Sequence, residues 1–189
     1  MASRRLKLDK LDIVQWNIQG LRAKNEELRS ILTEKKILIA CLQETLLGDS
    51  QWQPSRNCNL EKSPHFGGDN TRGVALLLHN SLQYTRLRLN TTLEAVAATF
   101  RAQKTYSICS IYLSPNARIN KGEIRNIIRQ LPRPYLLLGD FNGKHPLWDP
   151  HNPSDHRGRD IECLIMEESM TILNDNGQAT HYHIQSNKE

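Results

Sequence analysis

The chain has 189 residues, of which 38% are hydrophobic and 24% are charged, so it is long enough for one sizeable core and has the composition of a soluble globular protein. No stretch approaches the ~20 apolar residues that cross a bilayer, and the basic first ten residues lack the apolar segment of a secretion signal. The net charge of +5 suits a polyanionic partner, but the basic residues are spread along the chain, and a solvated surface explains them equally well.

Short apolar runs that end in turn residues predict strands, and apolar residues spaced three or four apart predict helices. In chain order, the pattern predicts a strand at 11–18, a helix at 25–36, a strand at 37–42, a polar loop at 48–70 with room for one short strand, strands at 73–78, 83–89, 93–101 and 105–113, a helix at 121–131, a strand at 134–138, a loop at 144–153, a helix at 160–169, and short strands at 171–174 and 179–183.

Strands dominate this order, and no repeat or linker interrupts it. The predicted fold class is therefore α/β, a layered β-sandwich flanked by helices, in a single domain over residues 11–189 that follows a basic extension of residues 1–10. The four cysteines form no C-x-x-C pair, which argues against a zinc module. Cys41 and Cys109 lie inside apolar runs and are predicted to be buried thiols of an intracellular, reduced protein.

Four of the predicted strands deliver polar side chains where their apolar runs end. These side chains are Asn17, Glu44, Tyr112, and the pair Asp140 and Asn142. If the strand ends share one edge of the fold, carboxylates, amides and a phenol gather there. Carboxylate and amide oxygens are ligands that Mg²⁺ prefers, with positions left for water and phosphate. Metal-assisted attack of water on a phosphodiester is the reaction class that fits.

Each of these residues also has a simpler explanation when it is taken alone. Asn17 suits a turn, Glu44 a solvated loop, and Tyr112 a packing position before a proline. Asp140 and Asn142 suit a turn with a side-chain cap. The joint pattern is more specific than any one of its members, and it favours the catalytic interpretation.

Five segments carry a family resemblance: VQWNIQGL, CLQET, IYLSP, LLLGDFNGKHPLW and RGRDIECLI. In this order they resemble the endonuclease–exonuclease–phosphatase superfamily. More narrowly, they are similar to the apurinic-endonuclease-like domain of non-LTR (LINE-type, jockey-like) retrotransposon proteins. The resemblance runs from about Leu11 to Thr180. The D-F-N-x-x-H-x-x-W segment and the R-G-R that follows it are more specific than the superfamily core.

The resemblance implies a role for each strand-end residue. Asn17 and Glu44 match metal-site positions, with Glu44 as the principal Mg²⁺ ligand. Tyr112 and Asn142 match residues that contact the scissile phosphate, and Asp140 matches the aspartate that orients the attacking water. Thr180 loosely matches a substrate-binding threonine, and His145 and Trp148 resemble features of the subgroup, with Trp148 expected to pack its loop.

The implied function is a Mg²⁺-dependent DNA endonuclease, with Mn²⁺ as an alternative cation, that nicks target DNA so that a reverse transcriptase can be primed. Double-stranded DNA is the expected partner, element RNA a partner of the full-length protein, and the nucleus the expected location; no membrane is involved. Two alternatives stay open. One is an inactive remnant that at most binds nucleic acid, and the other is a phosphatase of the same superfamily.

One departure bears on activity. The family has a Ser-Asp-His triplet after its last core strand, and its histidine handles the proton or the transition-state charge. The triplet Ser154-Asp155-His156 comes too early, ahead of a predicted helix, so His156 is expected to be a solvated loop residue. We therefore expect the fold to be incomplete at its C-terminus, without its last strands, and the 189-residue chain to be a weak or inactive nuclease.

Overall fold

The computed structural model describes residues 11–48, 52–54, 56–63, 72–118 and 120–174. The chain falls into two compact units, one within Met1–Ser114 and Gly122–Phe141, the other within Pro115–Lys121 and Asn142–Glu189. The predicted extension at residues 1–10 lies outside the described residues, and one domain over residues 11–189 stays a prediction. No helix among the described residues is long and apolar enough to cross a membrane.

The first unit begins with a mixed four-stranded sheet in the order β1-β2-β4-β3. Its strands are β1 (Ile13–Asn17), β2 (Ile39–Gln43), β3 (Cys58–Lys62) and β4 (Val74–His79). β1 and β2 are parallel, whereas β4 runs antiparallel to both β2 and β3. All five residues of β2 are buried, as expected for a central strand that is covered on both faces. β3 is the short strand anticipated inside the long polar loop.

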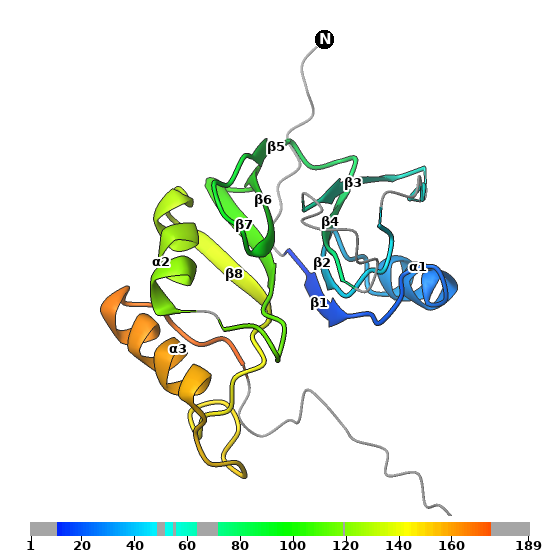
Figure 1. Ribbon diagram of the computed structural model, residues 1–189. Coiled ribbons are helices and arrows are strands. Elements are labelled where there is room, and N and C mark those ends of the chain that lie inside the picture. Colours follow the sequence, from blue (N-terminus) through cyan, green and yellow to red (C-terminus); the bar gives the residue numbers. More distant parts are fainter. Residues whose placement is uncertain (1–10, 49–51, 55, 64–71, 119, 175–189) are drawn as a thin grey trace, which may run out of the picture. The chain divides into compact units, whose positions relative to one another are not determined.

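A second mixed sheet has the order β5-β6-β7-β8. Its strands are β5 (Tyr84–Leu87), β6 (Glu94–Arg101), β7 (Thr105–Tyr112) and β8 (Tyr135–Asp140). β6 pairs antiparallel with β5 and β7, and β7 pairs parallel with β8. A parallel pair needs a crossover, which α2 (Lys121–Gln130) supplies, with its stripe of Ile124, Ile127 and Ile128 buried. α2 flanks the outer face of this sheet (Figure 1).

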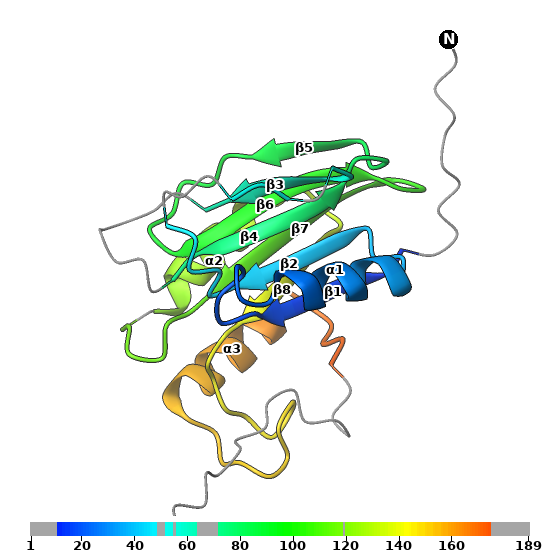
Figure 2. The same ribbon diagram turned by 90° about the vertical axis from the view of Figure 1, so that its right-hand side faces the viewer.

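The two sheets stack face to face around the main core (Figure 2). Leu76 and Leu78 of the first sheet and Phe100 and Ile108 of the second belong to one buried cluster. On the other face of the first sheet, α1 (Asn25–Glu34) packs Leu28 against β2 and β4. This layered sandwich flanked by helices confirms the predicted fold class. Cys41 and Cys109 are fully buried, as predicted.

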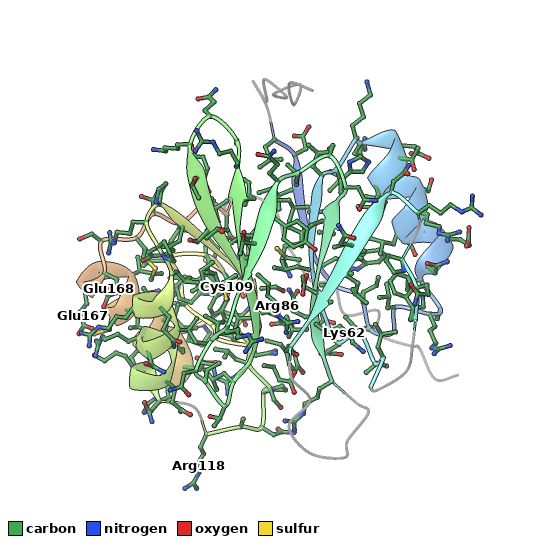
Figure 3. All side chains as sticks on the ribbon, turned by 90° about the horizontal axis from the view of Figure 1, so that it is seen from above. Lys62, Arg86, Cys109, Arg118, Glu167 and Glu168 are labelled. Atoms are coloured by element: carbon green, nitrogen blue, oxygen red, sulfur yellow. The ribbon has the colours of Figure 1, made fainter. Side chains whose placement is uncertain are left out.

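The outer edges of the two sheets are joined by polar contacts between β3 and β5, near the labelled Arg86 and Lys62 in Figure 3. The Arg86 guanidinium donates to Glu61 Oε2 at 3.0 Å and to the Lys62 carbonyl at 2.7 Å. The Tyr84 hydroxyl donates to Glu61 Oε1 at 3.0 Å. These bonds satisfy polar groups that an open sheet edge would otherwise present to solvent.

The second unit is built around α3 (His156–Glu167). This helix begins four residues before the predicted 160, because the Asp155 carboxylate caps it by accepting from the Gly158 N–H at 2.6 Å. It ends at 167 rather than at 169. The strand predicted at 171–174 is wrong, since these residues have no strand structure. The strand predicted at 179–183 lies outside the described residues.

Candidate active site

The site lies where four strands of the first unit end. Asn17 is the last residue of β1 and pairs with Gln43, the last residue of β2, so Glu44 follows directly at the same edge. In the other sheet, Tyr112 ends β7 and pairs with Asp140, which ends β8. Both pairs are parallel, and parallel strands bring their carboxyl ends to one edge of a sheet.

The amide of Asn17 links the two sheets at this edge. Its Nδ2 donates to Glu44 Oε1 at 2.8 Å and to Asp140 Oδ2 at 2.8 Å. The Tyr112 hydroxyl is hydrogen-bonded to the Glu44 carboxylate. The structure therefore brings together four of the six predicted site residues, one from each of four strands.

The carbonyl oxygen of the same amide is the atom that most strongly indicates a ligand. Asn17 Oδ1 is buried and has no hydrogen-bond partner among the described residues. A buried polar atom without a partner costs free energy, so such an atom calls for an explanation. The Asn17 amide must face the carboxylates with its NH₂ group, because the opposite orientation would turn the lone pairs of its oxygen toward two negative charges. A cation would coordinate this oxygen and would offset the negative charge of the two carboxylates.

The donor set fits a hard divalent cation. It comprises the Glu44 carboxylate and the Asn17 carbonyl oxygen, with the Asp140 carboxylate beside them. The described residues contain no cluster of three or more His, Cys, Asp or Glu side chains poised around a metal. One or two carboxylates with an amide oxygen are nevertheless what Mg²⁺ ordinarily takes from a protein, since water and substrate fill its other positions.

Tyr112 is only 7% exposed, and its surroundings keep it protonated. Burial is the largest cause, followed by the hydrogen bond to Glu44 and the negative charges of Glu44 and Asp140; together they raise the pKa of Tyr112 well above its ordinary value, against a smaller opposing effect of Arg72. The phenol is therefore a hydrogen-bond donor at neutral pH, which suits contact with an anionic phosphate oxygen.

The backbone around Glu44 has a conformation that side chains rarely adopt. Glu44 has φ 50° and the neighbouring Gln19 has φ 48°. The conformation is held by main-chain bonds from Gly20 N to Glu44 O at 2.9 Å and from Thr45 N to Gly73 O at 3.0 Å. Non-glycine residues in the left-handed region cost ~1–3 kcal/mol, and such strain tends to gather at functional sites.

Sequence reasoning missed a polar chain beneath the site. Gln15 Nε2 donates to Gln43 Oε1 at 2.6 Å, and Gln43 Nε2 donates to Ser110 Oγ at 2.9 Å. Gln43 and Ser110 are both fully buried. The signal was present in the sequence, because Gln15 and Ser110 each interrupt a strand and Gln43 ends one.

Sequence reasoning also missed two positions at which the backbone approaches a neighbouring segment too closely for a side chain. A Cβ on Gly139 would lie 1.9 Å from the Ile111 carbonyl oxygen, and a Cβ on Gly73 would lie 2.7 Å from Thr45 Oγ1. Gly73 has φ 116° as well. Glycine is required at both positions. Gly139 stands one residue before Asp140, and Gly73 stands directly before β4, whose first residue, Val74, pairs with Gln43 at the end of β2.

The contacts described above do not include the remaining two predicted site residues. Asn142 opens the second unit, has φ 46°, and its carbonyl oxygen accepts from Arg157 Nη1 at 3.3 Å. Its phosphate-binding role stays a prediction. Thr180 lies outside the described residues.

In the second unit, the loop before α3 is held by its two aromatic residues. Trp148 Nε1 donates to the Gly143 carbonyl at 2.8 Å, and the Trp148 ring lies 5.1 Å from that of His145. His145 Nε2 lies 3.3 Å from Glu162 on α3. Trp148 thus contacts its own loop, as expected.

The early Ser-Asp-His triplet has a structural explanation. Asp155 is the cap of α3, and the His156 side chain is 87% exposed and lies 3.2 Å from Asp160 one turn later. His156 was expected in a loop, and the structure places it in the first turn of a helix. Nothing in these contacts is particular to catalysis.

The comparisons with known proteins agree with this geometry. Residues 14–187 match the model of the Endonuclease/Exonuclease/phosphatase family. The chain is 25% identical over 180 residues to the probable RNA-directed DNA polymerase from transposon BS of Drosophila melanogaster, covering 93% of this chain and 20% of the relative. It is 24% identical over 178 residues to the corresponding protein of the X-element of the same fly, covering 86% and 18%. The chain thus spans about a fifth of these curated relatives.

Solved structures share the fold. The endonuclease domain of TRAS1, a telomere-specific non-LTR retrotransposon, matches with a TM-score of 0.73 at 24% identity, covering 86% of this chain and 74% of that one. The catalytic domain of Xenopus laevis APE2 matches with a TM-score of 0.58 at 19% identity, covering 81% and 67%.

Proposed function

The chain belongs to the endonuclease/exonuclease/phosphatase family, and from this membership and the geometry of its site we propose that it is the endonuclease domain of a non-LTR retrotransposon protein. Its substrate would be double-stranded DNA and its cation Mg²⁺. Nicking would supply the 3′-hydroxyl from which a reverse transcriptase starts. The similarity to two transposon polymerases and to a retrotransposon endonuclease domain supports the biological setting.

One observation carries the proposal. The Asn17 amide donates to two carboxylates from different sheets and leaves its own carbonyl oxygen buried and unsatisfied. A purely structural amide would bond at both ends. An orphaned oxygen beside two carboxylates supports a cation as its missing partner, in a family whose members generally depend on divalent metals.

Each side chain has a task in hydrolysis. Glu44 and the Asn17 oxygen would hold the cation, which when bound supplies Lewis-acid polarisation of a phosphoryl oxygen. Asp140, whose Oδ2 already accepts from Asn17, would orient water for in-line attack by accepting its proton. Tyr112 stays neutral, and on substrate binding it would turn its single phenolic proton from Glu44 to a non-bridging oxygen of the scissile phosphate.

The metal site can be tested without activity. Titration of the chain with Mn²⁺, followed by electron paramagnetic resonance, should show one site that Mg²⁺ competes for. Glu44→Gln should weaken binding by about 10–100-fold or more, because loss of a mere supporting partner already costs that much. Glu27→Gln, an exposed acid on α1, is the matched control. Equal affinity in all three proteins would remove the basis for a metal at this edge.

Activity is the second test. Supercoiled plasmid should be converted to the nicked form only with a divalent cation, and Asp140→Asn should slow this step by about 10²–10⁴-fold if Asp140 handles the proton. Each rate is compared with that of Glu44→Gln. Release of phosphate or mononucleotides from a 3′ end, without nicks, would favour the phosphatase or an exonuclease instead. Nicking that both substitutions leave intact would contradict the assignment.

A further inference from the structure

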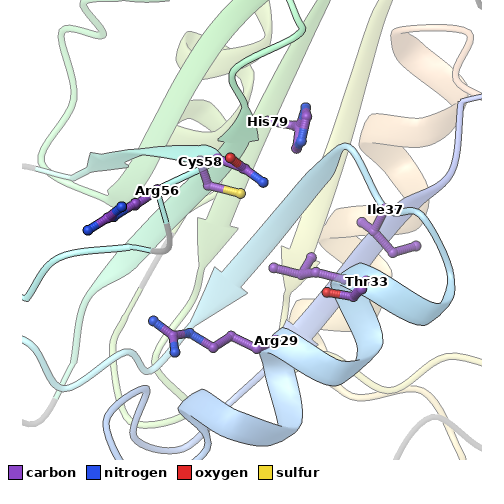
Figure 4. Close-up of a pocket in the computed structure, with 8 residues that line it drawn as sticks. Arg29, Thr33, Ile37, Arg56, Cys58 and His79 are labelled. Carbon is purple, nitrogen blue, oxygen red and sulfur yellow. The ribbon is translucent and has the colours of Figure 1, made fainter.

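A pocket of about 350 Å³ opens at the edge of the first sheet opposite to the candidate active site. Its lining comes from α1, from the segment that enters β2, and from the paired ends of β3 and β4: Arg29, Leu32, Thr33, Ile37, Arg56, Asn57, Cys58 and His79. Figure 4 shows α1 on one side and Cys58 and His79 on the other. Ile37 precedes β2 and Glu44 follows it, so the two sites are separated by roughly 20 Å of strand.

The lining is electrostatically one-sided. It contains two arginines and a histidine and no acidic side chain, and its remaining members are neutral polar or apolar. Arg29 forms an ion pair with Glu26 at 3.6 Å, and the Glu26 side chain is 85% exposed. Such an exposed ion pair contributes little and is easily exchanged for another partner. The Arg29 guanidinium can therefore turn to a ligand at little cost.

The walls of the pocket are fixed in advance. Asn80 holds the Arg56–Asn57 segment with two bonds, from its Nδ2 to the Arg56 carbonyl at 2.9 Å and from its N–H to the Asn57 carbonyl at 2.8 Å. The Ser81 N–H donates to His79 Nδ1 at 3.2 Å. That bond places the imidazole proton on Nε2, so His79 is a hydrogen-bond donor even when it is neutral.

The C-terminal end of α1 does not cancel the preference of the pocket for an anion. Carbonyl groups at a helix C-terminus repel anions when they are left unpaired. Here the Ile31, Leu32 and Thr33 carbonyls accept from Lys35, Ile37 and Lys36 at 3.0, 2.9 and 3.3 Å. What the helix presents to the pocket is the Arg29 side chain together with Leu32 and the neutral Thr33.

We propose that this pocket is a second anion site, and that it takes one nucleotide unit of a nucleic acid. The phosphate would lie between Arg29 and Arg56, near the Nε2–H of His79, and the sugar or base would cover Leu32 and Ile37. A pocket of about 350 Å³ is at the small end of the range for small-molecule sites, which suits a single nucleotide. The same chemistry would accept a free nucleotide, so the experiment separates the two sources.

Cys58 provides the readout, because its thiol lines the pocket and is partly exposed. Cys163, which is also partly exposed and belongs to the second unit, is the internal control. The full chain is alkylated with N-ethylmaleimide, and mass spectrometry follows each cysteine over time. Ligands are a single-stranded hexanucleotide, deoxyadenosine monophosphate and inorganic phosphate. At ten times its dissociation constant, a bound ligand should slow labelling of Cys58 by about tenfold and leave Cys163 unchanged.

Two variants complete the test. Arg29→Gln with Arg56→Gln should weaken protection of Cys58 by at least about tenfold for each lost charged contact. Arg101→Gln with Arg129→Gln removes the same charge from exposed positions elsewhere and should keep protection. If only the oligonucleotide protects Cys58, the ligand of the pocket is a nucleic-acid strand. If the mononucleotide protects it as well, the pocket also accepts a free nucleotide. If none of the three ligands slows Cys58, or if the two double variants behave alike, the proposal is overturned. Since labelling needs no catalysis, neither result depends on the endonuclease assignment.

Discussion

Substitution of Gly139 by alanine tests whether strand spacing positions the site. Gly139 stands one residue before Asp140 and pairs with Ile111 across the parallel ladder. Its added Cβ would lie 1.9 Å from the Ile111 carbonyl oxygen, 2.8 Å from the carbonyl carbon and 2.9 Å from Cγ2. The first two are main-chain atoms, so no rotamer change relieves the clash. β8 must instead move away from β7 by roughly 1.5 Å to restore van der Waals contact.

That movement has an energetic and a functional consequence. The bond from Leu113 N to the Asp140 carbonyl, now 2.9 Å, would be stretched, at a loss of about 1 kcal/mol. Overpacking adds about 1–3 kcal/mol. The sum of about 2–4 kcal/mol corresponds to a fall in melting temperature of about 4–16 °C for a chain of this size. Asp140 would also be carried away from Asn17, so Mn²⁺ affinity and nicking should fall.

The assay is thermal unfolding followed by circular dichroism, together with the Mn²⁺ titration. Gly122→Ala is the control, because it makes the same chemical change at an exposed position within α2. There alanine should stabilise the helix by roughly 0.5–1 kcal/mol. A Gly139→Ala protein that melts within about 2 °C of the wild type and binds Mn²⁺ normally would refute the close approach of β8 to β7, given that 2 °C corresponds to no more than about 1 kcal/mol.

Three further outcomes are expected. Because the pKa of Tyr112 is raised by burial and by its hydrogen bond to Glu44, its stabilising effect is fully present below the ordinary tyrosine pKa of about 10 and is lost as the pH rises from there through the raised pKa. An ultraviolet titration of phenolate should therefore be the same below about pH 10 in the wild type and in Tyr112→Phe. A difference in that range would contradict the buried hydrogen bond. Asp155→Ala should cost about 1 kcal/mol of stability by removing the cap of α3, measured by urea unfolding, whereas His156→Ala should change neither stability by more than about 0.5 kcal/mol nor nicking. Arg157→Lys should speed amide exchange in its own unit, since the guanidinium donates to three main-chain carbonyls. Arg159→Lys, which loses a bond to one carbonyl, should have a smaller effect. Equal exchange in both variants would contradict a stabilising role for the three Arg157 bonds.

The sandwich could be predicted from the sequence because its central strands, β2, β4, β6 and β7, and the β8 strand beside them are short, largely apolar runs with clear ends. Asn17, Glu44, Tyr112 and Asp140 were predicted as site residues for the same reason: they stand at, or directly after, the ends of β1, β2, β7 and β8. What joins them was not predictable, since the bridging role of Asn17 depends on which sheets face each other, and no local pattern encodes that packing. The early start of α3 was missed because its first turn is polar, and only the capping geometry of Asp155 marks it. The strand expected at 171–174 failed because the apolar or β-branched residues Thr171, Ile172 and Leu173 pair with no strand in the described part of the chain, and a short run without a partner does not make a strand.

The buried bond between Gln43 and Ser110 has a consequence for how the halves of the sandwich are aligned. Apolar side chains attract without direction, so a core of leucine and isoleucine alone would tolerate small slides of one sheet over the other. A hydrogen bond at 2.9 Å has both a length and a direction, and breaking it in the interior leaves two groups unsatisfied. Ser110 stands two residues before Tyr112, and Gln43 stands one residue before Glu44. The bond therefore fixes the alignment of the two sheets next to the candidate active site. A sliding movement of one sheet over the other would break this bond, and it would also separate the Glu44 and Asp140 carboxylates.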